Sequence, residues 1–387
     1  MYPNLYYAFK DLFGIEISFL RFINSFGFFV AIAFILCAVV LTRELKRKEK
    51  QGLLFPQKEK IITGKPASAG ELILNFLIGF LFGYKLIGTV FLDESVTADT
   101  QEFLFSSQGH WPTGIILGLL LAFLKWQEKN KQKRPKPEEK LEEIWPHQRV
   151  GDMVIFAALF GFAGAKIFHN LENWDKFVED PMGNLLSPDG LTFYGGLICA
   201  AFAIWYYARK KGIGIWHLND AIAPGLMLAY AVGRIGCQVS GDGDWGIENT
   251  APNPFSFLPD WMWSYTYPHN VNDMGDPIPG CVGRYCHELR HPVFPTPFYE
   301  TVMGLILFGV LMLVRKKMTI PGTLFSLYLI FNGIERFLIE KIRVNTTYSI
   351  FGFHPTQAEL ISSGLVIAGI VLWWYRRKTA ANASPRI

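Results

Sequence analysis

Nine apolar runs separated by charged segments constrain this chain more than any other feature of its sequence. Most of these runs are long enough to cross a lipid bilayer as a helix. Half of the 387 residues are hydrophobic and only 18% are charged, and the charges cluster between the apolar runs. The sequence therefore predicts an all-α polytopic membrane protein with about nine transmembrane helices, forming a single integral membrane domain over 1–387. The expected spans are 19–41, 71–91, 113–126, 152–170, 192–208, 217–236, 297–314, 321–339 and 357–375.

Basic residues mark every second connection between the runs. Lysine and arginine clusters follow the first, third, fifth, seventh and ninth runs, whereas the connections between them are rich in aspartate and glutamate. Cytoplasmic loops are enriched in lysine and arginine, so the N-terminus is expected outside and the C-terminus in the cytoplasm. The basic segments 43–65 and 129–140 are expected to be solvated loops against anionic lipid head groups. They lack the alternation of basic and aromatic residues typical of nucleic-acid binding, so no nucleic acid is expected as a partner.

The segment 71–134 resembles 152–212 at a constant offset of 81 residues. At this offset Gly83-Tyr84-Lys85 aligns with Gly164-Ala165-Lys166, and Trp111-Pro112-Thr113-Gly114 aligns with Thr192-Phe193-Tyr194-Gly195. We interpret 71–126 as a degenerate copy of the later helix pair. The alternative is that two membrane hairpins share glycine and lysine by chance.

The longest segment without an apolar run is 238–296. It is rich in Pro, Asn, Asp, Trp and Tyr, as expected for an ordered extracytoplasmic loop that caps a site. Cys281 and Cys286, separated by four residues, favour a local disulfide, while His287 and His291 nearby leave a metal site as the alternative.

The sixth run ends in an arginine followed by glycines and aspartates. Arg234 at this position is costly in a membrane unless it reaches the interface, pairs with an acid or binds an anion. Gly236 and Gly241 would let a ligand or another backbone approach closely. Asp242 supplies a carboxylate nearby. The pattern favours a site for an anionic head group.

The expected topology brings further polar residues to the same depth, near the outer leaflet. The eighth run ends with Arg336, Glu340 and Arg343, which share one helix face, and the seventh begins with Tyr299 and Glu300. Each feature alone has another explanation. A single arginine can anchor a helix by snorkelling, and Arg336 with Glu340 can be a stabilising ion pair. Their convergence favours a head-group site.

Four motifs in the expected order resemble those of bacterial prolipoprotein diacylglyceryl transferases. The segment GRIGCQVSGD (233–242) is similar to that family's GRIGNFxNGExxG motif, and YGGLIC (194–199) to its HGGLIG motif. FPTPFYE (294–300) resembles HPTQLYE, and the family's RFxxExxR motif is met in full from Arg336 to Arg343. The late glutamine of the family corresponds to Gln357. The resemblance covers roughly 15–42 and 150–376 and implies a seven-helix core, with 43–149 as an inserted segment.

The chain departs from the family motifs at several positions. Tyr194 stands in place of the family histidine, where it would alternatively belong to the aromatic belt, and Phe26 in place of an early tyrosine. Cys237 replaces the asparagine of the GRIGN motif. The acidic residue of the same motif is Asp242, with one extra residue before Trp245-Gly246. The resemblance therefore leaves the general base open among Tyr194, Asp242 and Glu340.

The resemblance implies transfer of a diacylglyceryl group from phosphatidylglycerol to the lipobox cysteine of a prolipoprotein signal peptide. It places the protein in the bacterial cytoplasmic (inner) membrane, among membrane lipids, with its active site toward the outer leaflet and without a metal or organic cofactor. The expected catalytic residues are Tyr194, Arg234, Asp242, Arg336 and Glu340. The expected lipid-binding residues are Arg234, Arg336, Gly195, Gly196, Gly236, Gly241, Arg343, Tyr299, Gln357 and Phe26.

Three other functions remain open from the residues alone. A small-molecule transporter would place ionisable groups near the middle of the membrane, whereas here they gather on one side. A non-catalytic lipid-binding or assembly protein would keep the arginines and tolerate the loss of acid–base groups. A transferase could also use another lipid donor.

Overall fold

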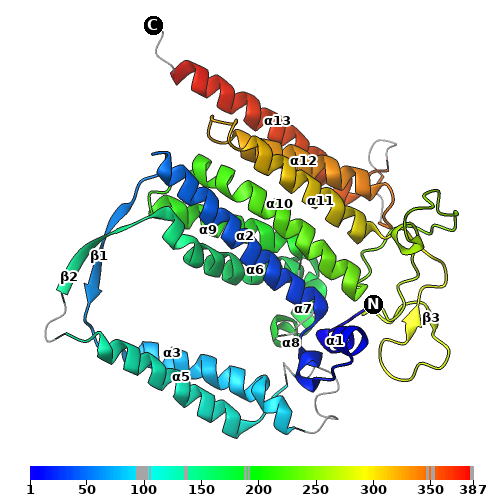
Figure 1. Cartoon of the computed structure of the whole chain (residues 1–387), viewed down its shortest axis with the longest axis horizontal. Coiled ribbons are helices and arrows are strands. Elements are labelled where there is room, and N and C mark those ends of the chain that lie inside the picture. Colours follow the sequence, from blue (N-terminus) through cyan, green and yellow to red (C-terminus); the bar gives the residue numbers. More distant parts are fainter. Residues whose placement is uncertain are drawn as a thin grey trace. The chain divides into compact units, whose positions relative to one another are not determined.

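The protein is mainly helical, and each of the nine expected runs coincides with one helix (Figure 1). The computed structural model describes residues 1–92, 103, 106–134, 138–186, 190, 192–345, 348–349 and 354–383. The helices that match the runs are α2 (Ser25–Lys50), α3 (Ala69–Lys85), α5 (Trp111–Lys131), α6 (Val150–Glu172), α9 (Phe193–Lys210), α10 (Ile215–Ser240), α11 (Thr296–Val314), α12 (Thr323–Glu340) and α13 (Gln357–Ala383).

Shorter elements lie between these helices. They comprise the helices α1 (Leu5–Phe13), α7 (Trp174–Glu179) and α8 (Pro181–Leu186), and the 3-10 turns Ser18–Phe22, Ile87–Phe91, Pro146–Arg149 and Asp260–Met262. The strands are β1 (Gln57–Thr63), β2 (Glu138–Ile144), β3 (Asp276–Pro277) and β4 (His287–Glu288).

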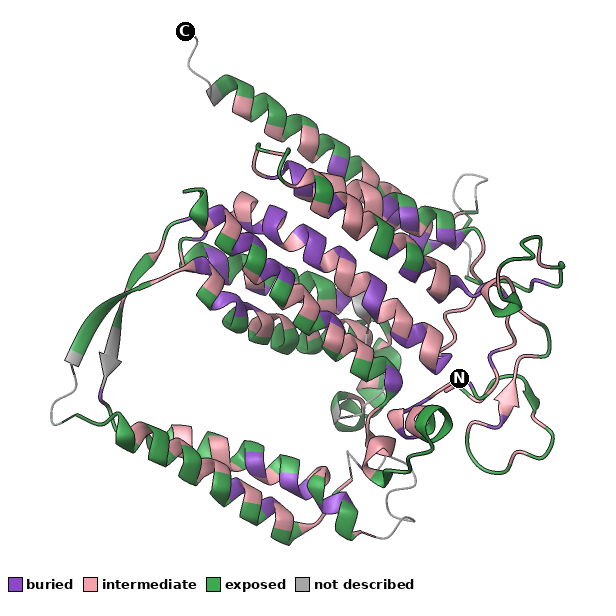
Figure 2. Ribbon diagram, in the orientation of Figure 1, coloured by how far each residue is buried: buried purple, intermediate pink, exposed green. Residues whose placement is uncertain are grey.

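Six helical segments of the described chain are long and apolar enough to cross a membrane. Figure 2 shows exposed positions along these helices, and many of them are large hydrophobic residues, as expected where lipid is the solvent. The protein is therefore an all-α multi-pass membrane protein. The six are Ser25–Lys50, Ala69–Phe91, Pro146–Glu172, Ile215–Ser240, Thr296–Val314 and Gln357–Asn382. That α5, α9 and α12 also span the membrane stays a prediction.

The described residues group into two compact units. One contains 1–8, 23–55 and 213–387, and the other contains 9–22 and 56–212. The expected domain boundaries, including the inserted segment 43–149, stay predictions.

In the first unit, α10 packs between α2 and α11, and α12 packs against α13 (Figure 1). Small residues set the spacing at two crossings. A Cβ on Gly236 would lie 3.2 Å from the Phe26 Cα of α2, and one on Gly304 of α11 would lie 2.9 Å from the Ala231 Cβ. The core below these crossings includes Met227, Leu311 and Leu324.

The segment 238–296 folds into a loop with defined contacts. Tyr267, which is fully buried, donates a hydrogen bond to Gln238 Oε1 at 2.8 Å, and the buried Asn270 side chain bonds three backbone carbonyls. Cys281 and Cys286 form a disulfide, so the local disulfide expected from their spacing is confirmed, and neither is available as a metal ligand.

The second unit contains two helical hairpins, α3 with α5 and α6 with α9. Glycine permits the close approach within each pair. A Cβ on Gly83 would lie 2.4 Å from the Thr113 carbonyl oxygen, and one on Gly164 would lie 2.6 Å from the Gly195 carbonyl oxygen. Gly83 and Gly164 are the residues that align at the 81-residue offset. The duplication of the helix pair stays a prediction. The similar close packing at Gly83 and Gly164 favours it.

The basic segments expected as loops are partly ordered, which corrects that expectation. α2 and α5 continue into them as far as Lys50 and Lys131, and β1 pairs antiparallel with β2 in the register Gln57 to Ile144. Strand propensity gives little sign of this ribbon, because lysine and glutamate are depleted in strands. The pairing instead sets opposite charges across the ribbon, including Lys60 with Glu139 at 3.5 Å.

Candidate functional site

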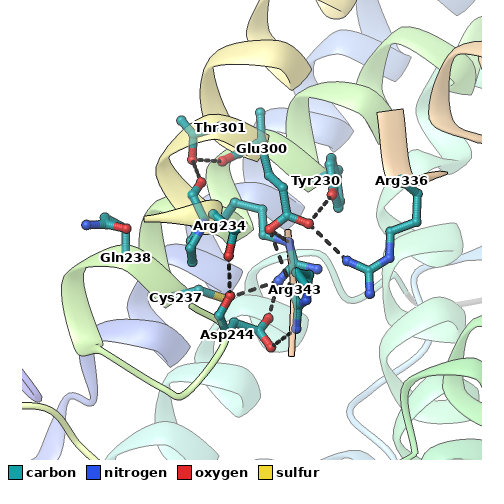
Figure 3. Close-up of polar contacts among 12 residues, drawn as sticks. Tyr230, Arg234, Cys237, Gln238, Asp244, Glu300, Thr301, Arg336 and Arg343 are labelled. Atoms are coloured by element: carbon teal, nitrogen blue, oxygen red, sulfur yellow. Dashed lines mark hydrogen bonds and ion pairs between the residues drawn. The ribbon is translucent and has the colours of Figure 1, made fainter. Parts of the chain in front are cut away.

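Three arginines of the first unit lie around one buried glutamate. Glu300, at the start of α11, is fully buried. Its Oε1 accepts a hydrogen bond from Arg336 at 3.0 Å, and its Oε2 lies 3.2 Å from Arg234 Nε and 3.8 Å from Arg343 Nη1 (Figure 3). Arg234 comes from the end of α10, Arg336 from α12, and Arg343 from the segment after α12. We call Arg234, Arg336 and Arg343 the arginine triad.

A second carboxylate joins two members of the triad. Asp244 forms an ion pair with Arg234 and accepts a hydrogen bond from Arg343 Nη2 at 2.6 Å (Figure 3). Asp244 was missed by the sequence prediction, which named Asp242. The available signal was the extra residue before Trp245-Gly246, which leaves the acidic position of that motif ambiguous between two aspartates.

The backbone after α10 carries Asp244 to this position. Gly241 ends the helix with φ +65°, and the Gly246 N–H then donates to the Phe294 carbonyl at 2.8 Å. The next N–H, of Ile247, donates to the Ile342 carbonyl at 2.8 Å. A Cβ on Gly246 would lie 2.4 Å from that same carbonyl oxygen, so only glycine fits where the loop crosses the end of α12.

The two loop aspartates have opposite electrostatic environments. Burial favours the neutral form of Asp244, but Arg234 and Arg343 outweigh it and lower its pKa to about 2. Burial, and then the charge of Asp244, raise the pKa of Asp242 above its ordinary value. Asp244 is therefore suited to a fixed ion pair, and Asp242 holds a proton more readily than an ordinary aspartate.

Glu340 contacts three neighbouring side chains. It forms the expected ion pair with Arg336 at 3.2 Å, and its Oε1 accepts hydrogen bonds from Thr356 at 2.7 Å and Asn345 at 2.5 Å. These contacts favour a role in orienting Arg336 over a role as a base.

Part of the triad's hydrogen-bonding capacity is unused. Arg343 Nε is buried and has no hydrogen-bond partner among the described residues. A buried donor without an acceptor is costly, so an oxygen of an anionic ligand would stabilise it. Guanidinium groups also match phosphate geometry with paired hydrogen bonds.

The remaining expected site residues have structural contacts. Tyr299 donates to the Trp263 carbonyl at 3.4 Å, Gln357 is exposed at the start of α13, and Phe26 lies against Gly236. In the second unit, Tyr194, Gly195 and Gly196 begin α9, where the two glycines pack against α6. The expected roles of these residues toward substrate stay predictions.

One donor set in the site has the spacing of a cation site. The Cys237 sulfur and carboxylate oxygens of Asp242 and Asp244 lie within 4.8 Å of one another. Both oxygens of Asp244 already face arginines, and Arg234 Nη1 lies 3.8 Å from the sulfur. Two guanidinium charges at this distance disfavour a metal cation.

Comparison with known proteins identifies the family. The model of the family described as prolipoprotein diacylglyceryl transferase matches residues 110–375. The chain belongs to this family. Family membership makes it a membrane transferase of this class, and the matched residues include the whole arginine triad.

Individual relatives agree with this assignment. The phosphatidylglycerol–prolipoprotein diacylglyceryl transferase of Shouchella clausii is 30% identical over 62% of this chain and 79% of its own length. The enzyme of the same name from Geobacillus kaustophilus is 28% identical over 68% of this chain and 85% of its own length. The enzyme of the same name from Halalkalibacterium halodurans is 25% identical over 68% of this chain and 79% of its own length. The family match begins at residue 110, so it overlaps the expected inserted segment 43–149 from there onward.

Proposed function

We propose that this protein transfers the diacylglyceryl group of phosphatidylglycerol to the lipobox cysteine of a prolipoprotein, the first step of lipoprotein maturation. The observation that carries the proposal is the half-buried arginine triad, with a buried donor on Arg343 that lacks a partner among the described residues, in a chain of this family. A group of this kind suits a phosphodiester whose charge increases during reaction.

The reaction places specific demands on the site. The cysteine sulfur forms a bond to the terminal glycerol carbon of the diacylglyceryl group, and the bond from that carbon to the phosphate oxygen breaks. Glycerol phosphate leaves with additional negative charge, which Arg234 and Arg336 stabilise through paired hydrogen bonds. The thiol proton passes to a base and finally to the leaving phosphate, so charge and protons balance.

Asp242 is the best-placed base of the loop. Its pKa is raised by burial and by Asp244, so it accepts a proton more readily than an ordinary aspartate. Asp242 also lies in the same cluster as the Cys237 sulfur. The lipobox thiol is mostly protonated at neutral pH and needs such a base.

The protein acts in the bacterial cytoplasmic membrane, with its N-terminus outside and its C-terminus in the cytoplasm. This orientation puts the arginine triad toward the outer leaflet. It follows from the alternating basic connections of the sequence and agrees with the reaction, since a lipobox crosses the membrane before it is modified.

A transfer assay with arginine variants tests the proposal. Purified protein in detergent is mixed with phosphatidylglycerol and a lipobox peptide, and the peptide mass is followed. We expect a gain of one diacylglyceryl group, reduced roughly 10²–10³-fold or more in Arg234→Ala and Arg336→Ala.

The matched control is Arg290→Ala, because Arg290 forms an exposed ion pair with Asp276 away from the triad. Its activity should equal that of the wild type. Near-normal transfer by either triad variant would contradict the mechanism, and lipid binding without any thioether would support a binding protein instead.

A further inference from the structure

One buried carboxyl group beside the arginine triad has no cation of its own. Glu335 is 3% exposed, and in the described part of the chain it forms no ion pair, although Asp244, Glu300 and Glu340 each contact at least one arginine. Its Oε2 is buried without a hydrogen-bond partner among the described residues. A buried carboxylate in such surroundings is costly, and protonation removes the charge.

The charge count of the cluster leads to the same conclusion. The triad supplies three positive charges, and the three described carboxylates that form ion pairs with it, Asp244, Glu300 and Glu340, balance them with three negative charges. An ionised Glu335 would add a fourth, uncompensated negative charge beside Glu300. In the resting protein, Glu335 therefore holds a proton.

A tyrosine hydroxyl connects Glu335 to the centre of the triad. Tyr230 Oη lies 2.9 Å from Glu300 Oε1 (Figure 3). The same oxygen lies 3.3 Å from Glu335 Oε1. A hydroxyl carries one hydrogen and can donate to only one of these oxygens at a time. Both contacts are satisfied when Tyr230 donates to Glu300 and protonated Glu335 donates to Tyr230.

We propose that Glu335, Tyr230 and Glu300 form a proton-transfer chain that moves negative charge away from the arginine triad when a phosphodiester binds. The proton of Glu335 passes to the Tyr230 oxygen while the Tyr230 hydroxyl proton passes to Glu300. Glu300 becomes neutral, Glu335 becomes a carboxylate that accepts a hydrogen bond from Tyr230, and no proton enters or leaves the protein.

The proton transfer removes the competition between Glu300 and an incoming phosphodiester for the arginine triad. At rest, Glu300 lies within ion-pair distance of all three arginines, so an incoming phosphodiester would meet both a competitor and a like charge. Neutralising Glu300 frees the arginines for the phosphate, and reversal of the transfer restores the ion pairs when the product leaves. Tyr230 and Glu335 act here as positioning residues, because they reach the substrate only through Glu300. This inference rests on the proposed function only in taking a lipid phosphodiester as the ligand.

Infrared spectroscopy tests the chain without depending on catalysis. At neutral pH the difference between the wild-type and Glu335→Gln spectra should contain the carbonyl stretch of one protonated carboxyl group, which we call the Glu335 band. Adding dimyristoyl phosphatidylglycerol should shift this band in the wild type but not in Tyr230→Phe. Dimyristoylglycerol, which has no phosphate, should leave it unchanged.

Transfer kinetics on the same preparations give a second readout. The KM for phosphatidylglycerol should rise roughly 5- to 150-fold in Glu335→Gln and in Tyr230→Phe, the usual range for coupling between two sites. The double variant should be no worse than the more affected single variant, since each interrupts the same chain. Asp276→Asn is the control, because Asp276 forms an exposed ion pair with Arg290 and contacts no member of the triad among the described residues.

The outcomes separate the two proposals. A carboxyl band that is identical in the wild type and Glu335→Gln, or a Glu335 band that does not respond to phosphatidylglycerol in the wild type, would overturn the proton-transfer chain. So would additive effects in the double variant. A lipid-dependent band shift without any thioether product would support the chain and contradict the transferase.

Discussion

Asp244→Asn should destabilise the protein in a manner that depends on pH, because this carboxylate joins two arginines of the triad. Asparagine keeps the size of the side chain and removes its charge. The ion pair with Arg234 and the charged hydrogen bond from Arg343 at 2.6 Å are both lost.

The magnitude follows from the pKa of Asp244. Arg234 and Arg343, opposed by burial, hold that pKa at about 2 against an ordinary 3.8. This difference corresponds to about 2.4 kcal/mol of folding free energy at full burial. The Asp244 side chain is 34% exposed, so solvent screening reduces the contribution to about 1–2 kcal/mol.

The downward shift in the pKa of Asp244 determines how the stabilisation changes with pH. Since the pKa is lower in the folded protein, the stabilisation is fully present above about pH 4 and disappears as the pH falls through about 2. Thermal unfolding in detergent, followed by circular dichroism, should give Asp244→Asn a midpoint about 1–3 °C below the wild type at pH 7. The two midpoints should converge in acid.

Asp276→Asn is the matched control, because Asp276 forms an exposed ion pair with Arg290, and it should change the midpoint little at any pH. A deficit in Asp244→Asn that stays constant from pH 7 to acid would refute the reasoning. Such a result would assign the loss to packing instead of charge.

Three further predictions concern the loop after α10. Gly246→Ala should cost about 1–3 kcal/mol in thermal unfolding and also lower activity, because its Cβ would lie 2.4 Å from the Ile342 carbonyl oxygen; unchanged stability would contradict this. Asp242→Asn should lower kcat roughly 10²–10⁴-fold and remove the acidic limb of the pH–rate profile, since a base with a raised pKa loses its proton only as the pH rises; a retained limb would exclude Asp242 as the base. Replacing Cys281 and Cys286 together by serine should cost about 2 kcal/mol of loop stability, measured by hydrogen exchange, with no effect of reductant on the variant; a reductant-sensitive variant would be inconsistent with this disulfide.

The helices were predictable because their signals are local in sequence. Apolar runs and basic connections give the nine helices, and the spacing of Arg336 and Glu340 gives their ion pair. The lengths of helices were less predictable. The apolar run that predicts α5 ends at residue 126, but the helix continues through polar residues to Lys131. Helical hydrogen bonding does not stop where the apolar residues stop.

The centre of the site was only partly predictable because its geometry depends on contacts between distant segments. Arg234, Arg336 and Arg343 were expected together, but nothing in their local sequence shows that Glu300 lies among all three. Asp244 reaches Arg343 only because the loop crosses the end of α12, where it forms backbone hydrogen bonds. Tertiary pairing of this kind leaves no periodic signal in the chain.

The Tyr230 hydroxyl gave no signal at all in the sequence. The residue lies one helical turn before Arg234 in an apolar run, where a tyrosine is typical of a buried aromatic. Its function depends on two glutamates from α11 and α12, and only the folded arrangement places them at 2.9 and 3.3 Å.

The most direct test of the account follows both products of one reaction. Phosphatidylglycerol labelled in its head-group glycerol is incubated with the protein and a lipobox peptide, and released glycerol phosphate and peptide thioether are quantified together. The account predicts one glycerol phosphate for each diacylglyceryl peptide, with both falling together in Arg234→Ala. Glycerol phosphate without thioether, or thioether formation that is unaffected in Arg234→Ala, would contradict it.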